Sequence, residues 1–538
     1  MYDMRLTEAY FPAQTDMEVL ETTVGGVLRD AASRAPDAPA MLEVGVAGET
    51  GRSWTYAELL AEAEALARAF STRFAPRERI AVWAPNAPEW VLIEYAAALA
   101  GLSLVTANPA YQTRELRYVL EQSGAVALFH VASFRGNPME TIAREAAEGL
   151  PKIRELVDME DPAAMARRGD RPDALHEATP DDEAQIQYTS GTTGFPKGAR
   201  LHHRGLTNNA RFFAARAEMK EREVWGGVMP LFHTAGCAMC VLGPAQTLGK
   251  LVLFRAFDPN VALDRIEAEG INTLTGVPTM LVAMMEAQAA KPRDVSAIRM
   301  AVSGGSMVAP ELVRSVCAAF DCGFQVVYGQ TEASPVLTQH FSTDAPEVVS
   351  ATVGQSLPQG EISIRRTGSN EVAATGEVGE VCLRGYAVML GYNDDPEATA
   401  AAIDADGWLH TGDLGTMDAK GYVALSGRVK EMIIRGGENL FPAEIENALL
   451  EHPDVAECAV FGLPDPKWGE VVACAIRPEP GASPRAAALK AHCRDRLAPQ
   501  KSPVVWSLVE AFPLTGSGKI RKFELARMQD DGELKALE

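Results

Sequence analysis

The sequence has no long uninterrupted apolar run, and it does not begin like an exported protein. Its longest apolar stretch, Tyr95 to Val105, falls well short of the roughly 20 residues that a membrane-spanning helix needs. The opening residues, MYDMRLTEAYFPAQTD, mix acidic and polar side chains, whereas a secretory signal has a basic start and an apolar core. We therefore expect no membrane span and a cytoplasmic location.

Positive charge is also scarce. Lys and Arg number 50 against 72 Asp and Glu, which gives a net charge of −22. Such a balance opposes non-specific attraction to nucleic acids and to anionic lipids, so nucleic acid is not an expected partner. Any anionic substrate must instead be held by a local cluster of donors, which makes Lys and Arg within Gly-rich segments informative.

Cysteine is infrequent and scattered, with eight residues in the chain. Cys237 and Cys240 form a C-x-x-C spacing near His233, which could begin a zinc site. A second pair at matching spacing is missing, and buried cysteine behaves as a small apolar residue. Core packing is therefore favoured over metal binding for this pair, and free thiols are expected throughout.

The patterns that are present predict an α/β protein of at least two domains, since 538 residues exceed one ordinary core. Thr55 and Glu58 have the spacing of a capping box before a helical pattern. Apolar runs such as RIAVWAP, VALFH, KLVLF and IRMAVSG alternate with helical segments, as in parallel sheets. From about Val349 the chain changes to short strands such as EISIRR, GEVCLRG and GYVALSGR, separated by Gly-rich turns.

We therefore predict a large N-terminal domain, residues 1–428, made of two α/β subdomains and a small β-barrel. A small mobile C-terminal α+β domain, residues 429–538, would follow a hinge near Lys430. Its apolar runs VAECAVFG, VVACAIRP and PVVWSLV are sufficient for a separate core.

The segment YTSGTTGFPKGA, residues 188–199, is the strongest chemical motif. Its glycines let backbone N–H groups turn inward, its hydroxyls add donors and Lys197 adds a positive charge, so it suits phosphates better than a plain surface loop does. It does not match the P-loop pattern of GTPases. The candidate phosphate-binding residues are Thr189, Ser190, Gly191, Thr192, Thr193, Gly194 and Lys197.

At this loop the sequence resembles the adenylate-forming superfamily, which contains acyl-CoA synthetases, luciferases and peptide-synthetase adenylation domains. Four further segments resemble the other signatures of that superfamily, in the same order: VYGQTEAS, GWLHTGDLG, GRVKEMIIRGGENLFPAEIE and PLTGSGKIRK. Together they cover the chain from about residue 50 to about residue 525. Five ordered matches are far more specific than one.

The resemblance implies a nucleotide site. It places Tyr328 against adenine and Glu332 at the Mg²⁺ that bridges the ATP phosphates. Glu332 and Thr189 are both expected to be metal ligands and catalytic residues. A carboxylate that starts a helix is the structural alternative for Glu332. The resemblance adds Gly304, Gly305, Ser306, Gly329 and Thr331 to the nucleotide side.

Further roles come from the same resemblance. Asp413 would accept hydrogen bonds from both ribose hydroxyls, Arg428 would lie beside the ribose and phosphate, and Lys519 would reach the α-phosphate and the substrate carboxylate as a catalytic residue. A surface salt bridge between Asp413 and Arg428 is the alternative. Gly436 and Gly437 would line the pantetheine path of coenzyme A, and a tight turn before a helix at Pro442 is the structural alternative.

The acid itself is the least defined part. The resemblance places His233 near the substrate carboxylate, as a catalytic residue, although a packed core histidine is the ordinary alternative. No Asp or Glu occurs from Leu231 to Lys250, so the ammonium group of an amino acid would stay unpaired. A fatty or aromatic acid is favoured, in a pocket expected to include His233, Ala235, Met239, Gly304, Pro335 and Val336.

These features predict an AMP-forming acid:CoA ligase that uses a small carboxylic acid, ATP, Mg²⁺ and coenzyme A. The absence of a G-x-S-x-G elbow fits a reaction without a side-chain nucleophile. An enzyme that loads a carrier protein in trans, a luciferase-like oxygenase and an inactive nucleotide-binding regulator are the alternatives, and a homodimer is left open.

Overall fold

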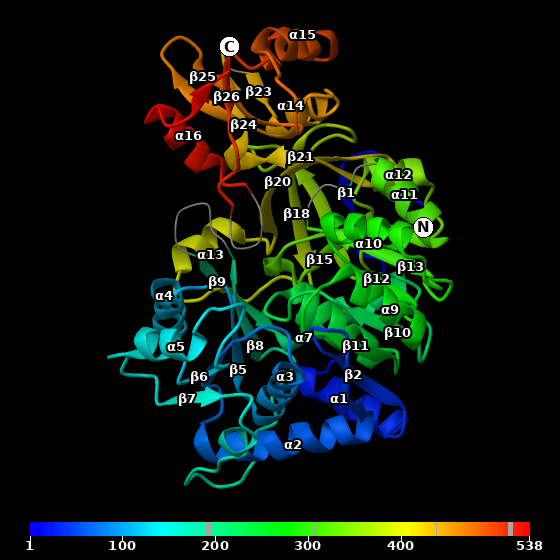
Figure 1. Cartoon of the computed structure of the whole chain (residues 1–538), viewed down its shortest axis with the longest axis vertical. Coiled ribbons are helices and arrows are strands. Elements are labelled where there is room, and N and C mark those ends of the chain that lie inside the picture. Colours follow the sequence, from blue (N-terminus) through cyan, green and yellow to red (C-terminus); the bar gives the residue numbers. More distant parts are fainter. Residues whose placement is uncertain (190–195, 306–307, 309, 437, 515–519, 538) are drawn as a thin grey trace.

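The computed structural model describes residues 1–189, 196–305, 308, 310–436, 438–514 and 520–537. Two large sheets with flanking helices form most of the chain, a smaller sheet adjoins them, and the C-terminal segment lies at one end of the long axis (Figure 1). The α/β fold class expected from the alternating pattern is confirmed.

The first large sheet has the strand order β19-β9-β8-β5-β4-β6-β7. Strands β4 to β8 pair in parallel, and β9 and β19 add antiparallel pairs at one edge. Parallel strands buried on both faces are rich in Val, Ile and Leu, which explains the apolar runs. The bounds are β4 (Arg79–Trp83), β5 (Ser103–Ala107), β6 (Ala127–His130), β7 (Glu155–Asp158), β8 (Glu183–Thr189), β9 (Lys197–His202) and β19 (Gly391–Tyr392).

The second large sheet has the order β16-β15-β14-β13-β12-β10-β11-β2-β3. Its centre is parallel, and antiparallel strands lie at both edges. The bounds are β2 (Pro39–Val44), β3 (Thr50–Thr55), β10 (Val224–Gly227), β11 (Lys250–Phe254), β12 (Thr273–Thr275), β13 (Met300–Gly304), β14 (Gly323–Gly329), β15 (Val336–Gln339) and β16 (Gln355–Ser356).

Several helices start at a residue whose side chain caps the first turn, as α1, α2 and α9 do. The Thr55 side chain accepts from the Glu58 N–H at 3.2 Å, and the Glu58 carboxylate accepts from the Thr55 N–H at 2.8 Å, so the predicted capping box is confirmed. The bounds are α1 (Val24–Arg34), α2 (Tyr56–Arg73), α3 (Pro88–Ala100), α4 (Thr113–Ser123), α5 (Met139–Ala147), α6 (Pro162–Met165), α7 (His203–Arg216), α8 (Gly243–Gln246), α9 (Pro259–Glu269), α10 (Pro278–Ala290), α11 (Pro310–Phe320), α12 (Pro346–Ala351) and α13 (Pro396–Ala402).

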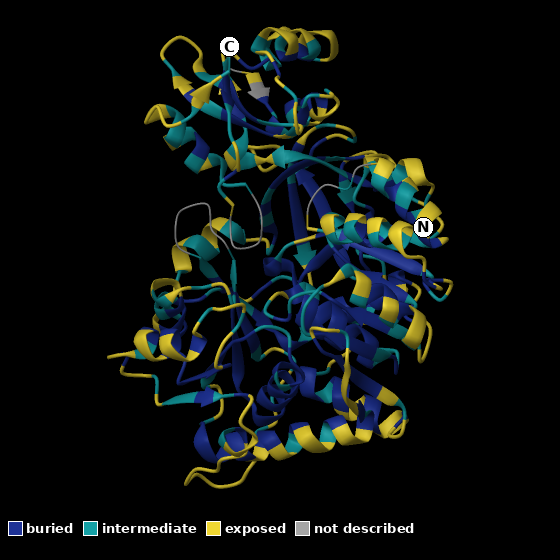
Figure 2. Ribbon diagram, in the orientation of Figure 1, coloured by how far each residue is buried: buried dark blue, intermediate teal, exposed yellow. Residues whose placement is uncertain are grey.

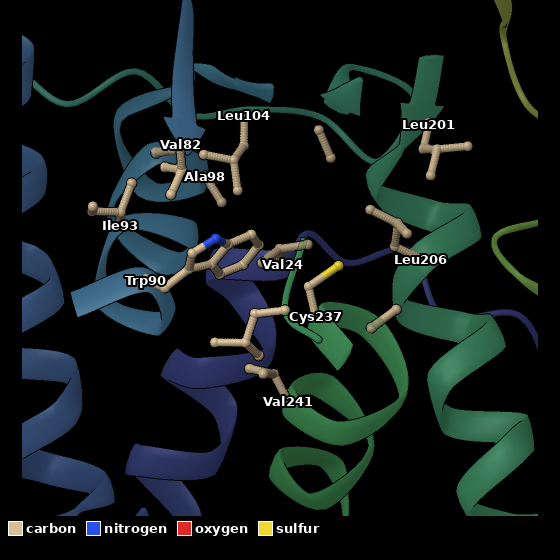
Figure 3. Packing of buried hydrophobic residues seen from close by; sticks show 14 of the residues in the cluster. Val24, Val82, Trp90, Ile93, Ala98, Leu104, Leu201, Leu206, Cys237 and Val241 are labelled. Carbon is tan, nitrogen blue, oxygen red and sulfur yellow. The ribbon is translucent and has the colours of Figure 1, made fainter. Parts of the chain in front are cut away.

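A π-helix, Ala235–Leu242, precedes α8. It belongs to the largest core, where side chains from four helices converge (Figure 3). These include Val24 of α1, Trp90 of α3, Leu206 of α7 and Cys237 of the π-helix. Cys237 and Cys240 are free and buried there, so the prediction of core packing for this pair is confirmed.

The small sheet is wholly antiparallel, with the order β1-β17-β18-β20-β21. It occupies the expected region of short strands, but its described strands form an open sheet with β1 and β21 at the edges, so closure into a barrel stays a prediction. The bounds are β1 (Tyr10–Phe11), β17 (Gly360–Arg365), β18 (Gly379–Gly385), β20 (Leu409–Met417) and β21 (Val423–Arg428).

The C-terminal segment forms an α+β unit with buried clusters of its own. Its sheet has the order β23-β22-β25-β26-β27, and β24 pairs with β25. The bounds are β22 (Ile433–Arg435), β23 (Glu438–Leu440), α14 (Pro442–Leu450), β24 (Val455–Asp465), β25 (Gly469–Pro478), α15 (Ala486–Arg496), β26 (Val505–Leu508), α16 (Lys522–Asp530) and β27 (Lys535–Ala536). The division at residues 428 and 429 stays a prediction.

Burial follows this layering: the sheets are largely buried, and exposed residues lie on the outer faces of helices and on loops (Figure 2). Among the described helices, none combines the length and apolar character that crossing a membrane requires.

Candidate active site

Three predicted nucleotide residues meet where strands of two different sheets approach each other. Tyr328 lies near the end of β14, and Asp413 and Arg428 are cross-strand partners on β20 and β21. The Tyr328 hydroxyl donates to Asp413 Oδ2 at 2.8 Å, and Arg428 Nε lies 2.7 Å from Asp413 Oδ1. Both oxygens of this carboxylate are therefore oriented by protein side chains, so the charged group needs little reorganisation to accept further donors.

Burial and charge together shape this group. Burial first, and the adjacent Asp413 carboxylate second, raise the pKa of Tyr328 well above its ordinary value, so the phenol stays a donor at physiological pH. Burial alone would lower the pKa of Arg428, but the pull of the Asp413 carboxylate gives a net increase. The Arg428 side chain remains 44% exposed and that of Asp413 only 10%, so the arginine is the accessible member of the pair.

Glu332 belongs to a second polar group. It lies in a 3₁₀ turn, Thr331–Ala333, just after β14, and it is buried. The Tyr392 hydroxyl donates to Glu332 Oε1 at 2.7 Å, and Lys197 Nζ lies 5.0 Å from the centre of the Tyr392 ring. Tyr392 therefore connects the candidate metal ligand to the lysine that closes the phosphate-loop motif. A hard carboxylate oxygen beside a hydroxyl suits Mg²⁺ rather than a soft metal.

The phosphate-loop motif is framed by a β-hairpin. Thr189 and Lys197 are cross-strand partners at the ends of β8 and β9, and Thr189 Oγ1 donates to the Lys197 carbonyl at 3.5 Å. The predicted residues Ser190, Gly191, Thr192, Thr193 and Gly194 lie outside the described residues. Because β19 pairs with β9 and β9 pairs with β8, Tyr392 and Thr189 lie on strands that are separated only by β9.

The glycines of the nucleotide side have packing reasons for lacking a side chain. A Cβ on Gly304 would lie 2.5 Å from the Val327 carbonyl, and one on Gly329 would lie 2.1 Å from the Pro335 carbonyl. Gly305 differs from Gly304 and Gly329, because a Cβ there would meet no atom within 4 Å; its φ of +80° favours glycine instead. Thr331 is buried, and Ser306 lies outside the described residues.

The residues predicted for the acid divide into two groups. Met239 and Val336 belong to one buried apolar cluster that also contains Trp225, and Ala235 packs against it. His233 is exposed instead, and its Nδ1 accepts from the Ala235 N–H at 3.2 Å just before the π-helix. Because π-helical turns are frequent at functional sites, this helix is a structural signal that the sequence analysis did not anticipate.

The C-terminal unit contributes a glycine and an aromatic side chain that face each other. Gly436 has φ +61°, and a Cβ there would lie 3.0 Å from the Trp468 ring. The Trp468 ring is 42% exposed and is flanked by Arg435 at 5.4 Å and by Lys467 Nζ at 4.8 Å. Lys430 lies in a 3₁₀ turn, Val429–Glu431, directly after β21. Gly437 and Lys519 lie outside the described residues.

Two functional candidates, Tyr392 and Trp468, escaped the sequence analysis. Tyr392 has no local signal, because it meets Glu332 only through the pairing of β19 with β9. Trp468 had a weak signal, an aromatic residue between Lys467 and a glycine in a turn.

With this geometry in view, comparison with known proteins identifies the family. The AMP-binding enzyme model matches residues 28–393, and the AMP-binding enzyme C-terminal domain model matches residues 444–519. The chain belongs to the AMP-binding enzyme family. All the predicted nucleotide-side residues between Thr189 and Tyr328 fall within the first match, whereas Asp413, Arg428 and Lys430 lie between the two matches.

Individual AMP-binding enzymes resemble the chain over nearly its full length. The "putative acyl-CoA synthetase YngI" of Bacillus subtilis (strain 168) is 35% identical over 94% of this chain and 97% of its own. The human "medium-chain acyl-CoA ligase ACSF2, mitochondrial" is 34% identical over 97% of this chain and 90% of its own. The o-succinylbenzoate CoA synthetase (MenE) of Bacillus subtilis, solved with the acyl-adenylate intermediate OSB-AMP, has a TM-score of 0.82 and 27% identity over 94% of this chain and 98% of its own.

Proposed function

We propose that this AMP-binding enzyme is an ATP-dependent carboxylic acid:CoA ligase. In the first step a carboxylate oxygen of the acid attacks the α-phosphorus of ATP, and the bond to pyrophosphate breaks, giving acyl-AMP. In the second step the CoA sulfur attacks the acyl carbon, the thiol loses its proton, and the carbon–oxygen bond to AMP breaks. The products are acyl-CoA, AMP and pyrophosphate.

The observation that supports this proposal most strongly is the short segment from Tyr328 to Val336. Tyr328 contacts the candidate ribose acceptor Asp413, Glu332 is the candidate metal ligand, and Val336 belongs to the apolar cluster with Met239. One strand end and its turn thus contribute to the nucleotide side, the metal side and the acid side. A reaction that joins an acid to a nucleotide phosphate needs this adjacency.

Positively charged side chains of the candidate site suit adenylation, in which negative charge gathers around the α-phosphorus. A carboxylate approaches a phosphorus surrounded by anionic oxygens, so positive groups must already be in position. Lys197 and Arg428 are two described cations of this kind, and Lys519 is a third in the proposal. When bound through Glu332 and Thr189, Mg²⁺ would neutralise phosphate charge as a Lewis acid.

For the acid, we propose a fatty or aromatic acid rather than an amino acid. The cluster around Met239, Val336 and Trp225 offers apolar surface, and no Asp or Glu occurs from Leu231 to Lys250 to pair an ammonium group. We also propose that the C-terminal unit, residues 429–538, turns at Lys430 and presents Lys519 for adenylation and Gly437 for transfer to CoA.

The test is pyrophosphate release across a panel of fatty, aromatic and amino acids, each with and without CoA. Acid-dependent release that becomes catalytic with CoA supports the ligase. Turnover that requires an added carrier protein would instead identify a loading enzyme, and no release with any acid would identify a nucleotide-binding regulator.

A further inference from the structure

Strand β20 carries a bulge at the candidate ribose acceptor. Leu414 pairs with Glu380 of β18, and His410 pairs with Cys382, so residues 411–413 face the single residue Val381. Gly412 has φ +72° within this bulge. A bulge leaves backbone groups without ladder partners and redirects a side chain, and here the redirected side chain is that of Asp413.

Side chains replace the missing ladder bonds. The Thr411 hydroxyl donates to the Val381 carbonyl at 2.7 Å and accepts from the Asp413 N–H at 3.1 Å. Glu380 Oε1 accepts from the Gly412 N–H at 2.9 Å. The position of Asp413 therefore depends on a carboxylate of the neighbouring strand that has no direct contact with it.

Glu380 is in turn held by His410. Glu380 Oε2 lies 2.8 Å from His410 Nδ1, and the Asp404 carboxylate lies 3.4 Å from His410 Nε2. Both side chains are about four-fifths buried, with 18% exposure for Glu380 and 20% for His410. An imidazole with a carboxylate at each nitrogen is favoured as the doubly protonated cation. The Glu380 bond, partly offset by burial, raises the pKa of His410 above 6.5.

The same place also has the composition of a metal site, since Glu380, Cys382 and His410 offer ligand atoms within 4.8 Å of one another. Burial first, and the Glu380 charge second, raise the pKa of the Cys382 thiol, and its sulfur lies 3.5 Å from His410 Nδ1 as a weak hydrogen-bonding partner. A hydrogen-bonded imidazolium explains the geometry without an ion.

We propose that Glu380 and His410 are positioning residues of the nucleotide site: their ion pair fixes the β20 bulge so that the Asp413 carboxylate is presented to the ribose hydroxyls. The inference rests on the proposed function, in which Asp413 accepts those hydroxyls. In this proposal Glu380 and His410 act through the Gly412 N–H and the bulge rather than by binding the nucleotide.

The pair makes nucleotide binding depend on pH. The groups that face His410 are Glu380 and Cys382 of β18 and Asp404 of the preceding loop, and Arg365 of β17 lies 4.0 Å from Asp404. His410 keeps its proton in the folded state to a higher pH than in the unfolded chain. The stabilisation is thus complete below the unfolded pKa and is lost as pH rises through the folded pKa, so the KM for ATP should rise as pH passes through the raised pKa of His410.

The experiment measures KM and kcat for ATP, 2′-deoxyATP and 3′-deoxyATP in pyrophosphate release, at pH values on both sides of the raised His410 pKa. Glu380→Ala and His410→Ala should raise the KM for ATP on the order of tenfold and reduce the preference for ATP over both deoxy analogues. His410→Asn keeps a donor near Nδ1 and does not titrate, so it should recover most of the loss and flatten the rise in KM with pH.

Two controls separate positioning from general damage. Glu361→Ala removes another carboxylate of the same sheet, one that pairs with Arg384 at 2.8 Å, and it should leave ribose discrimination at the wild-type value. Asp413→Asn should abolish that discrimination. If Asp413→Asn leaves it intact, the ribose role in the proposed function is wrong. If Asp413→Asn abolishes it while Glu380→Ala does not, only the positioning inference fails. Stoichiometric zinc that is lost in Cys382→Ser would also overturn the inference.

Discussion

The nucleotide side and the acid side of the candidate active site are built on different physical principles. On the nucleotide side, charged and polar groups orient one another in pairs, as in Tyr328 with Asp413 and Tyr392 with Glu332. On the acid side, Met239, Val336 and Trp225 pack as an apolar cluster, which is non-directional. The polar side is therefore sensitive to single atoms, and the apolar side is sensitive to volume.

This contrast has a functional consequence. Hydrogen-bonded carboxylates suit one ligand geometry, so the nucleotide chemistry tolerates little change. An apolar pocket distinguishes acids by about 1 to 3 kcal/mol per methylene, so its residues can change the preferred acid without disturbing the chemistry. Substitutions on the two sides should accordingly affect different kinetic constants. The predictions below are ordered from the largest expected effect to the smallest.

The largest effect should come from the C-terminal unit. Lys519→Ala should slow adenylation on the order of 10²- to 10³-fold, because a preorganised charge is lost, while transfer from supplied acyl-AMP is largely spared. A bulky residue at Gly437 should do the reverse and obstruct the path of the thiol. Single-turnover measurement of each half-reaction checks both variants. Equal slowing of both halves by Lys519→Ala would show that the unit does not present alternate faces.

Glu332→Gln should reduce adenylation about a hundredfold at limiting Mg²⁺, since an amide is a poorer ligand for this ion than a carboxylate. The loss should shrink as Mg²⁺ is raised, while ATP binding stays measurable by calorimetry. Glu361→Gln provides the matched control in the small sheet. Turnover that is unchanged at every Mg²⁺ concentration would remove Glu332 from the site.

Val336→Ala and Met239→Ala should reorder the preferred acids by about tenfold or more, with a KM for ATP close to wild type. kcat/KM across acids of increasing length and bulk is the measurement, for His233→Ala as well. Val316→Ala, in a separate buried cluster, controls for lost stability alone. Changes confined to the ATP dependence would place the acid pocket elsewhere.

The smallest effect should come from Tyr392→Phe, which removes one hydroxyl and keeps the ring beneath Lys197. We expect the Mg²⁺ requirement to rise between about twofold and tenfold, which corresponds to the roughly 0.5 to 1.5 kcal/mol of one ordinary hydrogen bond. Tyr10→Phe is a matched control, because Tyr10 donates to the Glu361 carboxylate away from the site. Equal effects of the two variants would mean that Tyr392 acts only through stability.

Much of this site could be predicted from the sequence, because its main residues lie in contiguous motifs. Glu332 and Val336 belong to one segment, and Asp413 and Arg428 lie in two Gly-flanked strands whose pairing then brings them together. The start of helix α2 could also be predicted, because the capping box of Thr55 and Glu58 involves residues that are close in the sequence.

The residues that sequence reasoning missed act through contacts made only in the folded chain. Tyr392 reaches Glu332 across sixty positions, and Glu380 reaches the bulge before Asp413 across thirty-two. Gly304 and Gly329 are predicted on the nucleotide side, and close packing against the Val327 and Pro335 carbonyls already disfavours a side chain at both positions. Contacts between residues so far apart leave no repeating pattern in the sequence, so they could not be predicted from it.

The most direct test of the central claim follows the oxygen of the acid. When the enzyme turns over an ¹⁸O-labelled carboxylic acid with ATP and CoA, one carboxylate oxygen becomes the bridge of acyl-AMP and stays on phosphorus when the thiol displaces AMP. Mass spectrometry should therefore find one ¹⁸O in the phosphate of AMP, with unlabelled pyrophosphate. Label in inorganic phosphate together with ADP, or none on any phosphorus, would contradict the proposed adenylation.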